Sequence, residues 1–386
     1  MIDASAVGTE GAEAYVEAEL DVPDGFFRPA LADVVPYEPG KPIEEVEREY
    51  GIEDPIKIAS NENPLGPSPM AVKAIGERLS ALHLYPDGDC YQLRRAVAAK
   101  LGVAEDRLIF GNGSNELIEF AVRTFMRPGD EAVMARHAFA IYHLVVKSAG
   151  GMSKVVPMKN LTHDLEAMGE ATTANTRIVF LANPNNPTGT SFKKKAWEKF
   201  LGRVGPETLI VVDEAYFEYV TDPEYPNSIE YQTDGRMIIT FRTFSKLYGL
   251  AGLRLGYAVG PKEIIGWMHR VRQPFNVNSI AQWGAIAALD DTDHVRRSIE
   301  TNRAGMEYLT REVGKLGLEH VPSQANFILL RVGDGAAIFQ KLLQRGVIVR
   351  PMGGYELPEY IRVTIGTAKE NARFINELKS IIAGRA

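Results

Sequence analysis

A lysine in an apolar and hydroxyl-rich stretch is the first feature of the chain that could do chemistry. Lys246 stands in the run Thr-Phe-Ser-Lys-Leu-Tyr-Gly, whose members predict poor access to water. Because burial disfavours the charged form of an amine, such a lysine becomes a nucleophile that can hold an aldehyde cofactor as a Schiff base. Arg254 offers a fixed cation and Thr243 and Ser245 offer hydroxyl donors, which together suit a phosphate group. Considered alone, the stretch also fits a solvated loop lysine.

Two polar clusters upstream each follow an apolar run that is typical of a buried parallel strand. Asn186 lies in the turn after the run 178–182, and Asp213 and Tyr216 follow the run 209–212. Open α/β sheets bind ligands at the carboxyl ends of such strands. A carboxylate placed there can keep a pyridinium nitrogen protonated, and an amide and a phenol can both reach a ring hydroxyl. Singly these are an ordinary turn and a strand end, but their order with the lysine and arginine favours a cofactor site.

With these residues in order, the chain resembles the fold type I pyridoxal 5'-phosphate (PLP) aminotransferases, and among them most of all the histidinol-phosphate aminotransferases. The resemblance runs from about Pro36 to the C-terminus. It implies an α/β fold with a large, doubly wound, mostly parallel sheet domain and a smaller α+β domain. It also implies a homodimer with shared active sites. The mechanism implied is ping-pong, with Lys246 as Schiff-base lysine and then as general base.

The resemblance assigns contacts residue by residue. The cofactor contacts are Lys246, Asp213, Asn186, Tyr216, Thr243, Ser245 and Arg254, the glycine-rich cup Gly113, Ser114 and Asn115, the ring-stacking Phe139, and Tyr85 of a Tyr-Pro segment that reaches the partner subunit. The substrate contacts are Arg362, Arg350, Tyr37 and Asn186, and the catalytic group is Lys246, Asp213, Tyr216 and Asn186. Two positions depart from the family pattern. Phe139 lacks the hydroxyl of the tyrosine in several relatives, and Asn115 lacks the negative charge of the aspartate in many.

Two of these assignments can also be argued from the residues. The cup precedes the helical pattern 117–125, and backbone N–H groups at a helix N-terminus bind phosphate. Capping of that helix by Ser114 or Asn115 is the alternative, and both roles can hold at once. Arg362 lies in the apolar strand-like run 361–365, where an unpaired guanidinium would be costly. We therefore expect an anionic ligand at this arginine.

The other assignments compete with plainer structural interpretations. Arg350 follows an apolar run, and its alternative is a surface salt bridge. Phe139 follows a predicted strand, where it could also be part of the core, and Tyr37 could pack the N-terminal segment. The role of Tyr85 rests on the resemblance alone. Three of the seven histidines, His137, His143 and His163, form no metal-ligand spacing with other ligands and are interpreted as structural or solvated.

The substrate pair that the resemblance favours is histidinol phosphate with 2-oxoglutarate, a step of histidine biosynthesis. An aromatic amino-acid aminotransferase shares nearly all of these residues and stays open as an alternative. A PLP decarboxylase of a phosphorylated amino acid is a third option on the same scaffold. A PLP-fold regulatory module without turnover is disfavoured, because Lys246 is present and no DNA-binding segment is fused to the chain.

Composition excludes several other classes. The 386 residues are 45% hydrophobic and 24% charged, which is ordinary for a globular protein of two domains. The net charge of -7 is concentrated in residues 1–27, which contain seven acidic and no basic residues, so the remainder offers no basic field for nucleic acid. No apolar stretch approaches a membrane span of roughly 18 residues, and residues 1–25 lack a secretory pattern. With a single cysteine, we expect a cytoplasmic enzyme.

The elements that must position these residues follow an alternating pattern. Strand-like runs at 131–135, 154–157, 177–182, 209–213, 237–241 and 255–259 are separated by helix-like segments, which indicates a doubly wound sheet. Beyond residue 277 the pattern changes to helices at 293–315, 336–345 and 369–382 and strands at 325–331 and 361–365. We expect an acidic tail at 1–27, a segment at 28–60 that joins the small domain, a large PLP-binding domain at 61–277 and a small domain at 278–386.

Overall fold

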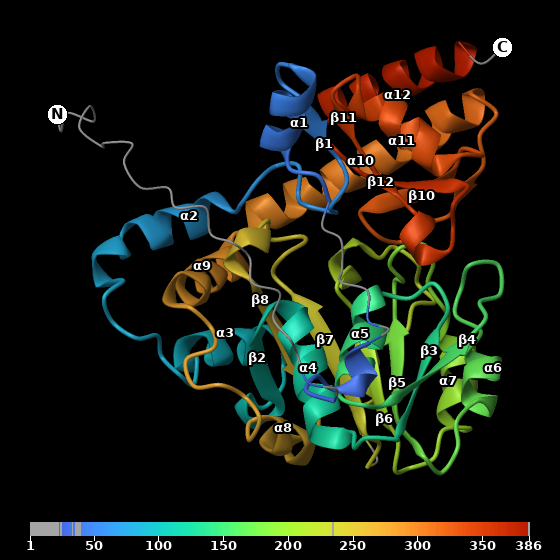
Figure 1. The fold of residues 1–386 in the computed structure, drawn as a ribbon. Coiled ribbons are helices and arrows are strands. Elements are labelled where there is room, and N and C mark those ends of the chain that lie inside the picture. Colours follow the sequence, from blue (N-terminus) through green and yellow to red (C-terminus); the bar gives the residue numbers. More distant parts are fainter. Residues whose placement is uncertain (1–22, 24, 33, 35–39, 234, 385–386) are drawn as a thin grey trace.

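A computed structural model of the chain describes residues 23, 25–32, 34, 40–233 and 235–384. Tyr37 and nearly all of the acidic stretch lie outside the described residues. Figure 1 shows a large sheet flanked by helices, with a smaller unit of strands and helices, coloured orange to red, above it. Among the described residues, no helix combines the length and apolarity needed to cross a bilayer.

The large sheet has seven strands in the order β2-β8-β7-β6-β5-β3-β4. Its strands are β2 (Leu108–Asn112), β3 (Glu131–Ala135), β4 (Met152–Val156), β5 (Thr176–Ala182), β6 (Leu209–Asp213), β7 (Ile238–Thr243) and β8 (Leu255–Val259). Only β8 runs antiparallel to its neighbours; the other pairings are parallel. The expected doubly wound, mostly parallel sheet is confirmed. Strand β2 was not among the strands predicted from the sequence.

Both faces of this sheet are buried, as parallel strands require. Side chains of β2 show this by alternation, since Ile109 joins one apolar core while Leu108 and Phe110 join another. Figure 1 shows α4 and α5 in front of the sheet. The helices of this region are α2 (Pro69–Gly76), α3 (Tyr91–Leu101), α4 (Gly113–Phe125), α5 (Ala140–Ser148), α6 (Leu165–Glu170), α7 (Lys194–Leu201), α8 (Lys262–Met268) and α9 (Ser279–Asp290).

Helix α4 places the cup because its apolar residues are spaced to face the sheet. Leu117, Ile118, Ala121 and Val122 recur at helical spacing and are fully buried in the core of the parallel strands. Their burial holds the helix against β2, β7 and β8. The N-terminus of α4, at Gly113, therefore opens at the edge of the sheet where β2 ends.

The smaller unit combines a four-stranded sheet with three helices. The sheet order is β12 (Arg350–Pro351), β13 (Tyr360–Thr364), β10 (Phe327–Arg331) and β9 (His320–Val321), with antiparallel pairing throughout. The helices are α10 (Thr292–Lys315), α11 (Gly335–Leu343) and α12 (Ala368–Ala383), and α12 begins with a capping box formed by Thr367 and Glu370. The helix predictions for 293–315 and 369–382 agree with α10 and α12 within two residues at each end.

Two segments near the boundaries show which unit of the fold they belong to. In the N-terminal part, α1 (Ile43–Tyr50) precedes β1 (Ile56–Lys57), which pairs in parallel with β11 (Val347–Ile348) and so joins the smaller unit. Helix α9 follows residue 277 in sequence but shares its core with Leu93 and Leu108 of the large unit. The domain boundaries expected from the sequence stay a proposal.

Candidate active site

The carboxyl ends of β5, β6 and β7 and the strands of the smaller unit enclose a cavity of about 300 Å³. Most of the residues selected from the sequence line it: Ser114, Asn115, Phe139, Asn186, Asp213, Tyr216, Thr243, Ser245, Lys246, Arg254, Arg350 and Arg362. Gly113 adjoins this cavity, and Tyr85 does not line it. The tertiary structure therefore brings together residues that are spread over about 250 positions of the sequence.

Lys246 follows β7 and presents its amine to the cavity. Burial, together with the nearby cations Arg362 and Arg254, lowers the pKa of this amine to about 8, while Glu62 and Asp213 oppose the effect. A lysine with this pKa is partly neutral near physiological pH, so it can act as a nucleophile or as a base. The desolvation expected from the sequence run is present in the structure.

The cup at the start of α4 fits a phosphate group. Gly113 has φ +76°, and a Cβ at this position would lie 2.4 Å from Nη2 of Arg254. Only glycine therefore lets the guanidinium approach the N-terminus of α4, where backbone N–H groups lack helical partners. Ser114 and Ser245 add hydroxyl groups at the cavity wall. Thr243 is engaged locally, because its hydroxyl donates to the carbonyl of Leu255 and accepts from the N–H of Ser245.

Asp213 ends β6 and is buried with two hydrogen bonds to its carboxylate. The hydroxyl of Tyr142 donates to Oδ2 at 2.8 Å, and the N–H of Ala215 donates to Oδ1 at 3.1 Å. Burial raises the pKa of the Asp213 carboxyl, and the Tyr142 bond opposes that rise. Carboxylate oxygens accept more than one hydrogen bond each, so Asp213 keeps capacity for a cationic N–H donor from the cavity.

Tyr216 and Asn186 lie on the same wall of the cavity. Nδ2 of Asn61 donates to the Tyr216 hydroxyl at 2.8 Å. Burial raises the pKa of Tyr216 to about 12, so this phenol stays protonated and can donate to an oxygen in the cavity. Asn61 was not among the site residues predicted from the sequence, and neither was the contact of Tyr142 with Asp213. Tyr142 lies three residues after Phe139, a helical spacing that could have suggested its inward direction.

Two arginines face each other across the strands of the smaller unit. Arg362 on β13 is the direct register partner of Arg350 on β12, and both line the cavity. The Arg362 guanidinium donates to the carbonyl of Ala59 at 2.7 Å and to Oδ1 of Asn186, and it lies over the ring of Phe327. Like charges in directly opposite positions repel each other, so an anion between them would be strongly favoured.

Aromatic residues complete the surroundings of the site in two different ways. Phe139 lines the cavity and meets the ring of Tyr142 edge-on, with centroids 5.8 Å apart. Tyr85 is 83% exposed and stacks on Phe275 with centroids 4.9 Å apart. Exposed apolar side chains accompany Tyr85 in the segment 70–91, namely Met70, Val72, Leu79, Leu82, Leu84 and Tyr91.

The three histidines lie in different settings, none of them among the residues that line the cavity. His137 contacts the carbonyl of Tyr355 at 2.7 Å, and the buried His163 contacts Oδ1 of Asn185 at 3.2 Å. Burial lowers the pKa of His163 to about 4, so its ring is neutral. Within the described part of the chain, His, Cys, Asp and Glu form no group of three or more that could hold a metal ion.

Comparison with known proteins gives one consistent result. Residues 53–378 match the family described as aminotransferase class I and II. A histidinol-phosphate aminotransferase of Moorella thermoacetica is 51% identical, with 92% of this chain and 93% of that protein aligned. Histidinol-phosphate aminotransferase 1 of Nitrosococcus oceani is 47% identical over 92% of this chain and 98% of its own length. The crystal structure of histidinol-phosphate aminotransferase from Sinorhizobium meliloti in complex with PLP has a TM-score of 0.86 at 28% identity, covering 94% of this chain and 99% of that one.

Proposed function

Since the chain belongs to the aminotransferase class I and II family, we propose that it is a PLP-dependent aminotransferase that takes histidinol phosphate as amino donor and 2-oxoglutarate as acceptor. One observation carries the choice of donor: two cationic side chains, Arg350 and Arg362, stand opposite each other in a cavity that also holds Lys246. A phosphate carries more charge than a carboxylate and makes better use of a second guanidinium.

Some residues of the cavity would hold PLP in place, and others would adjust the charge of its ring. When bound, PLP supplies a ring that accepts negative charge from the carbon that loses its proton. Lys246, whose amine has a lowered pKa, would hold the aldehyde of the cofactor and would act as the base at that carbon. Asp213 would pair with the ring nitrogen, and Asn186 and Tyr216, on the same cavity wall, would bind the ring oxygen. The cup, the hydroxyl of Ser245 and the guanidinium of Arg254 would hold the phosphate, and Phe139 would cover one face of the ring.

Arg362 is suited to bind an anionic group in both half-reactions, because its guanidinium is held by the Ala59 carbonyl within a buried strand. Arg350 adds the second cation. We expect Arg350→Ala to lower kcat/KM for histidinol phosphate by about tenfold more than for phenylalanine, since only the phosphate uses the extra charge; this corresponds to about 1.4 kcal/mol. The measurement is a panel of amino donors at saturating 2-oxoglutarate. Equal losses, or a wild-type preference for phenylalanine, would favour the aromatic aminotransferase.

We also propose that the active unit is a homodimer in which Tyr85 enters the site of the partner subunit. The support is that Tyr85 is exposed, is held in place by Phe275, and stands within a group of exposed apolar side chains. Mixing Lys246→Ala subunits with Tyr85→Ala subunits should restore part of the activity, because one site of the mixed dimer would have both residues intact. Absence of rescue after demonstrated subunit exchange would contradict the shared site.

A further inference from the structure

We propose that Tyr142 is a positioning residue for the reaction: its hydroxyl keeps the Asp213 carboxylate ionised and aimed into the cavity, and its ring sets the tilt of Phe139. The inference rests on the proposed function, because it assumes that Asp213 faces the ring nitrogen of PLP. Tyr142 itself lies in the wall of the cavity, between the two groups that would contact the cofactor ring.

The hydrogen bond between Tyr142 and Asp213 is enclosed by protein. The Tyr142 side chain is 0% exposed, and its hydroxyl lies 2.8 Å from Oδ2 of Asp213. The second carboxylate oxygen accepts one bond, from the N–H of Ala215. Both donors stabilise the charged form, whereas burial stabilises the neutral acid. Removing the phenol hydroxyl would leave one donor, so the balance would move toward the neutral acid.

Packing restricts the phenol ring to this orientation. The Tyr142 ring stacks on Phe180 of β5, with centroids 4.7 Å apart and an interplanar angle of 8°. It also meets Phe139 edge-on at 5.8 Å and 86°. Both Phe180 and Tyr142 are fully buried, so a rotation of the phenol would require the core to reopen. The hydroxyl is therefore directed at Asp213 before any cofactor is bound.

This arrangement predicts how the holoenzyme responds to acid. A neutral Asp213 cannot stabilise a positive charge on the ring nitrogen, so activity and cofactor affinity fall once the carboxylate takes up a proton. In the Tyr142→Phe holoenzyme this proton uptake should begin at higher pH, because the charged carboxylate has lost a donor. A hydrogen bond to a charged group corresponds to roughly a tenfold to hundredfold effect, so we expect the acid limb of kcat/KM to move up by about 1 pH unit or more.

The test compares Tyr142→Phe with a matched control. Tyr231→Phe removes another phenol-to-carboxylate bond, from Tyr231 to Glu198 at 3.2 Å, and neither residue lines the cavity. For each holoenzyme we would measure the dissociation constant of PLP and the pH profile of kcat/KM. Tyr142→Phe should weaken PLP binding by about tenfold and shift the acid limb, while Tyr231→Phe should leave both within about twofold. An unshifted acid limb and unchanged PLP affinity in Tyr142→Phe would overturn the proposal.

A second variant distinguishes the effect of the hydrogen bond from the effect of ring packing. It also keeps the proposal testable if Tyr142→Phe folds poorly. Replacing Tyr142 by 3-fluorotyrosine keeps the ring and makes the hydroxyl a stronger donor. The acid limb should then move to lower pH, opposite to its shift in Tyr142→Phe, whereas a packing role predicts no change of sign. If the wild-type protein shows neither transamination nor PLP binding, the proposed function fails. If wild type is active and both substitutions leave the acid limb in place, only the role of Tyr142 fails.

Discussion

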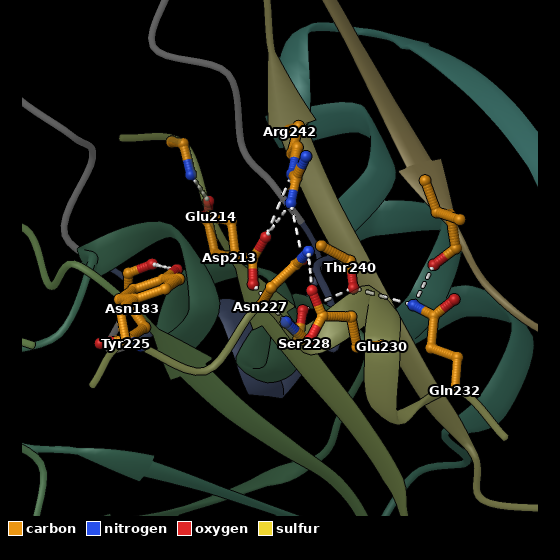
Figure 2. A network of polar contacts seen from close by, with 12 residues as sticks. Asn183, Asp213, Glu214, Tyr225, Asn227, Ser228, Glu230, Gln232, Thr240 and Arg242 are labelled. Carbon is orange, nitrogen blue, oxygen red and sulfur yellow. Dashed lines mark hydrogen bonds and ion pairs between the residues drawn. The ribbon is translucent and has the colours of Figure 1, made fainter. Parts of the chain in front are cut away.

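Asp213 and Glu214 are neighbouring carboxylates at the end of the same strand, but their surroundings differ: Glu214 is paired with a buried arginine, whereas Asp213 borders the cavity. Glu214 is 0% exposed and accepts from Nε and Nη2 of Arg242, at 3.1 and 2.7 Å, and from the N–H of Ser228 at 2.9 Å. Figure 2 shows this network beside Asp213. Asp213 accepts from one phenol and one N–H and borders the cavity.

The difference shows how a structural charge can be distinguished from a functional one. The Glu214 charge is neutralised by a guanidinium that is itself covered by the ring of Phe217, 3.5 Å away, and is held by Asn227. Such a pair leaves little capacity for a ligand. The Asp213 charge has no cation in hydrogen-bond contact among the described residues, and burial raises its pKa. A buried carboxylate without a partner cation is costly unless a ligand supplies one.

The largest effect should come from Asp213→Asn. This change keeps the shape of the side chain but removes the charge opposite the ring nitrogen, so kcat/KM should fall by about a thousandfold or more, equivalent to about 4 kcal/mol. Steady-state kinetics and denaturant unfolding of the same preparation are the measurements. A loss below tenfold would show that the reaction does not need this charge, and the functional role assigned to Asp213 in contrast to Glu214 would be wrong.

Glu214→Gln makes the same chemical change one residue later and should act on stability instead. It leaves the Arg242 guanidinium buried without its counter-charge, which should lower the free energy of unfolding by about 3–5 kcal/mol. Activity per folded molecule should stay within a few-fold of wild type. Glu214→Leu combined with Arg242→Met serves as the control and should destabilise less than Glu214→Gln alone. A stable but inactive Glu214→Gln would reverse the assigned roles.

The smallest effect concerns the pH dependence of cofactor uptake by the protein without PLP. The neutral amine of Lys246 attacks the aldehyde, and its pKa is lowered by burial to about 8 from an ordinary 10.5. The uptake rate should therefore rise about tenfold per pH unit below pH 8 and level off above it, instead of rising toward pH 10. Stopped-flow absorbance of PLP uptake from pH 6 to 10 measures this. A continued rise above pH 9 would show an amine that is not desolvated.

Much of the fold could be predicted from the sequence because local patterns control it. The strand predictions at 131–135, 209–213 and 255–259 agree residue for residue with β3, β6 and β8. Each of these strands is a short, mostly apolar run, and that pattern depends only on neighbouring residues. Strand β2 was missed because its second half is glycine and asparagine, which have low strand propensity, and it pairs with β8 from about 145 positions later.

The sequence by itself determined which side chains could take part in the chemistry. The residue types at Lys246, Asp213, Arg254 and Arg362, together with their order, indicated a site for an aldehyde cofactor with a phosphate group. Only the tertiary structure decided how these groups are charged and held. The lowered pKa of Lys246 needs the burial produced by packing, and the orientation of Asp213 at the end of β6 needs Tyr142 from helix α5. Desolvation and hydrogen-bond geometry depend on distances between remote segments, which residue type and spacing do not contain.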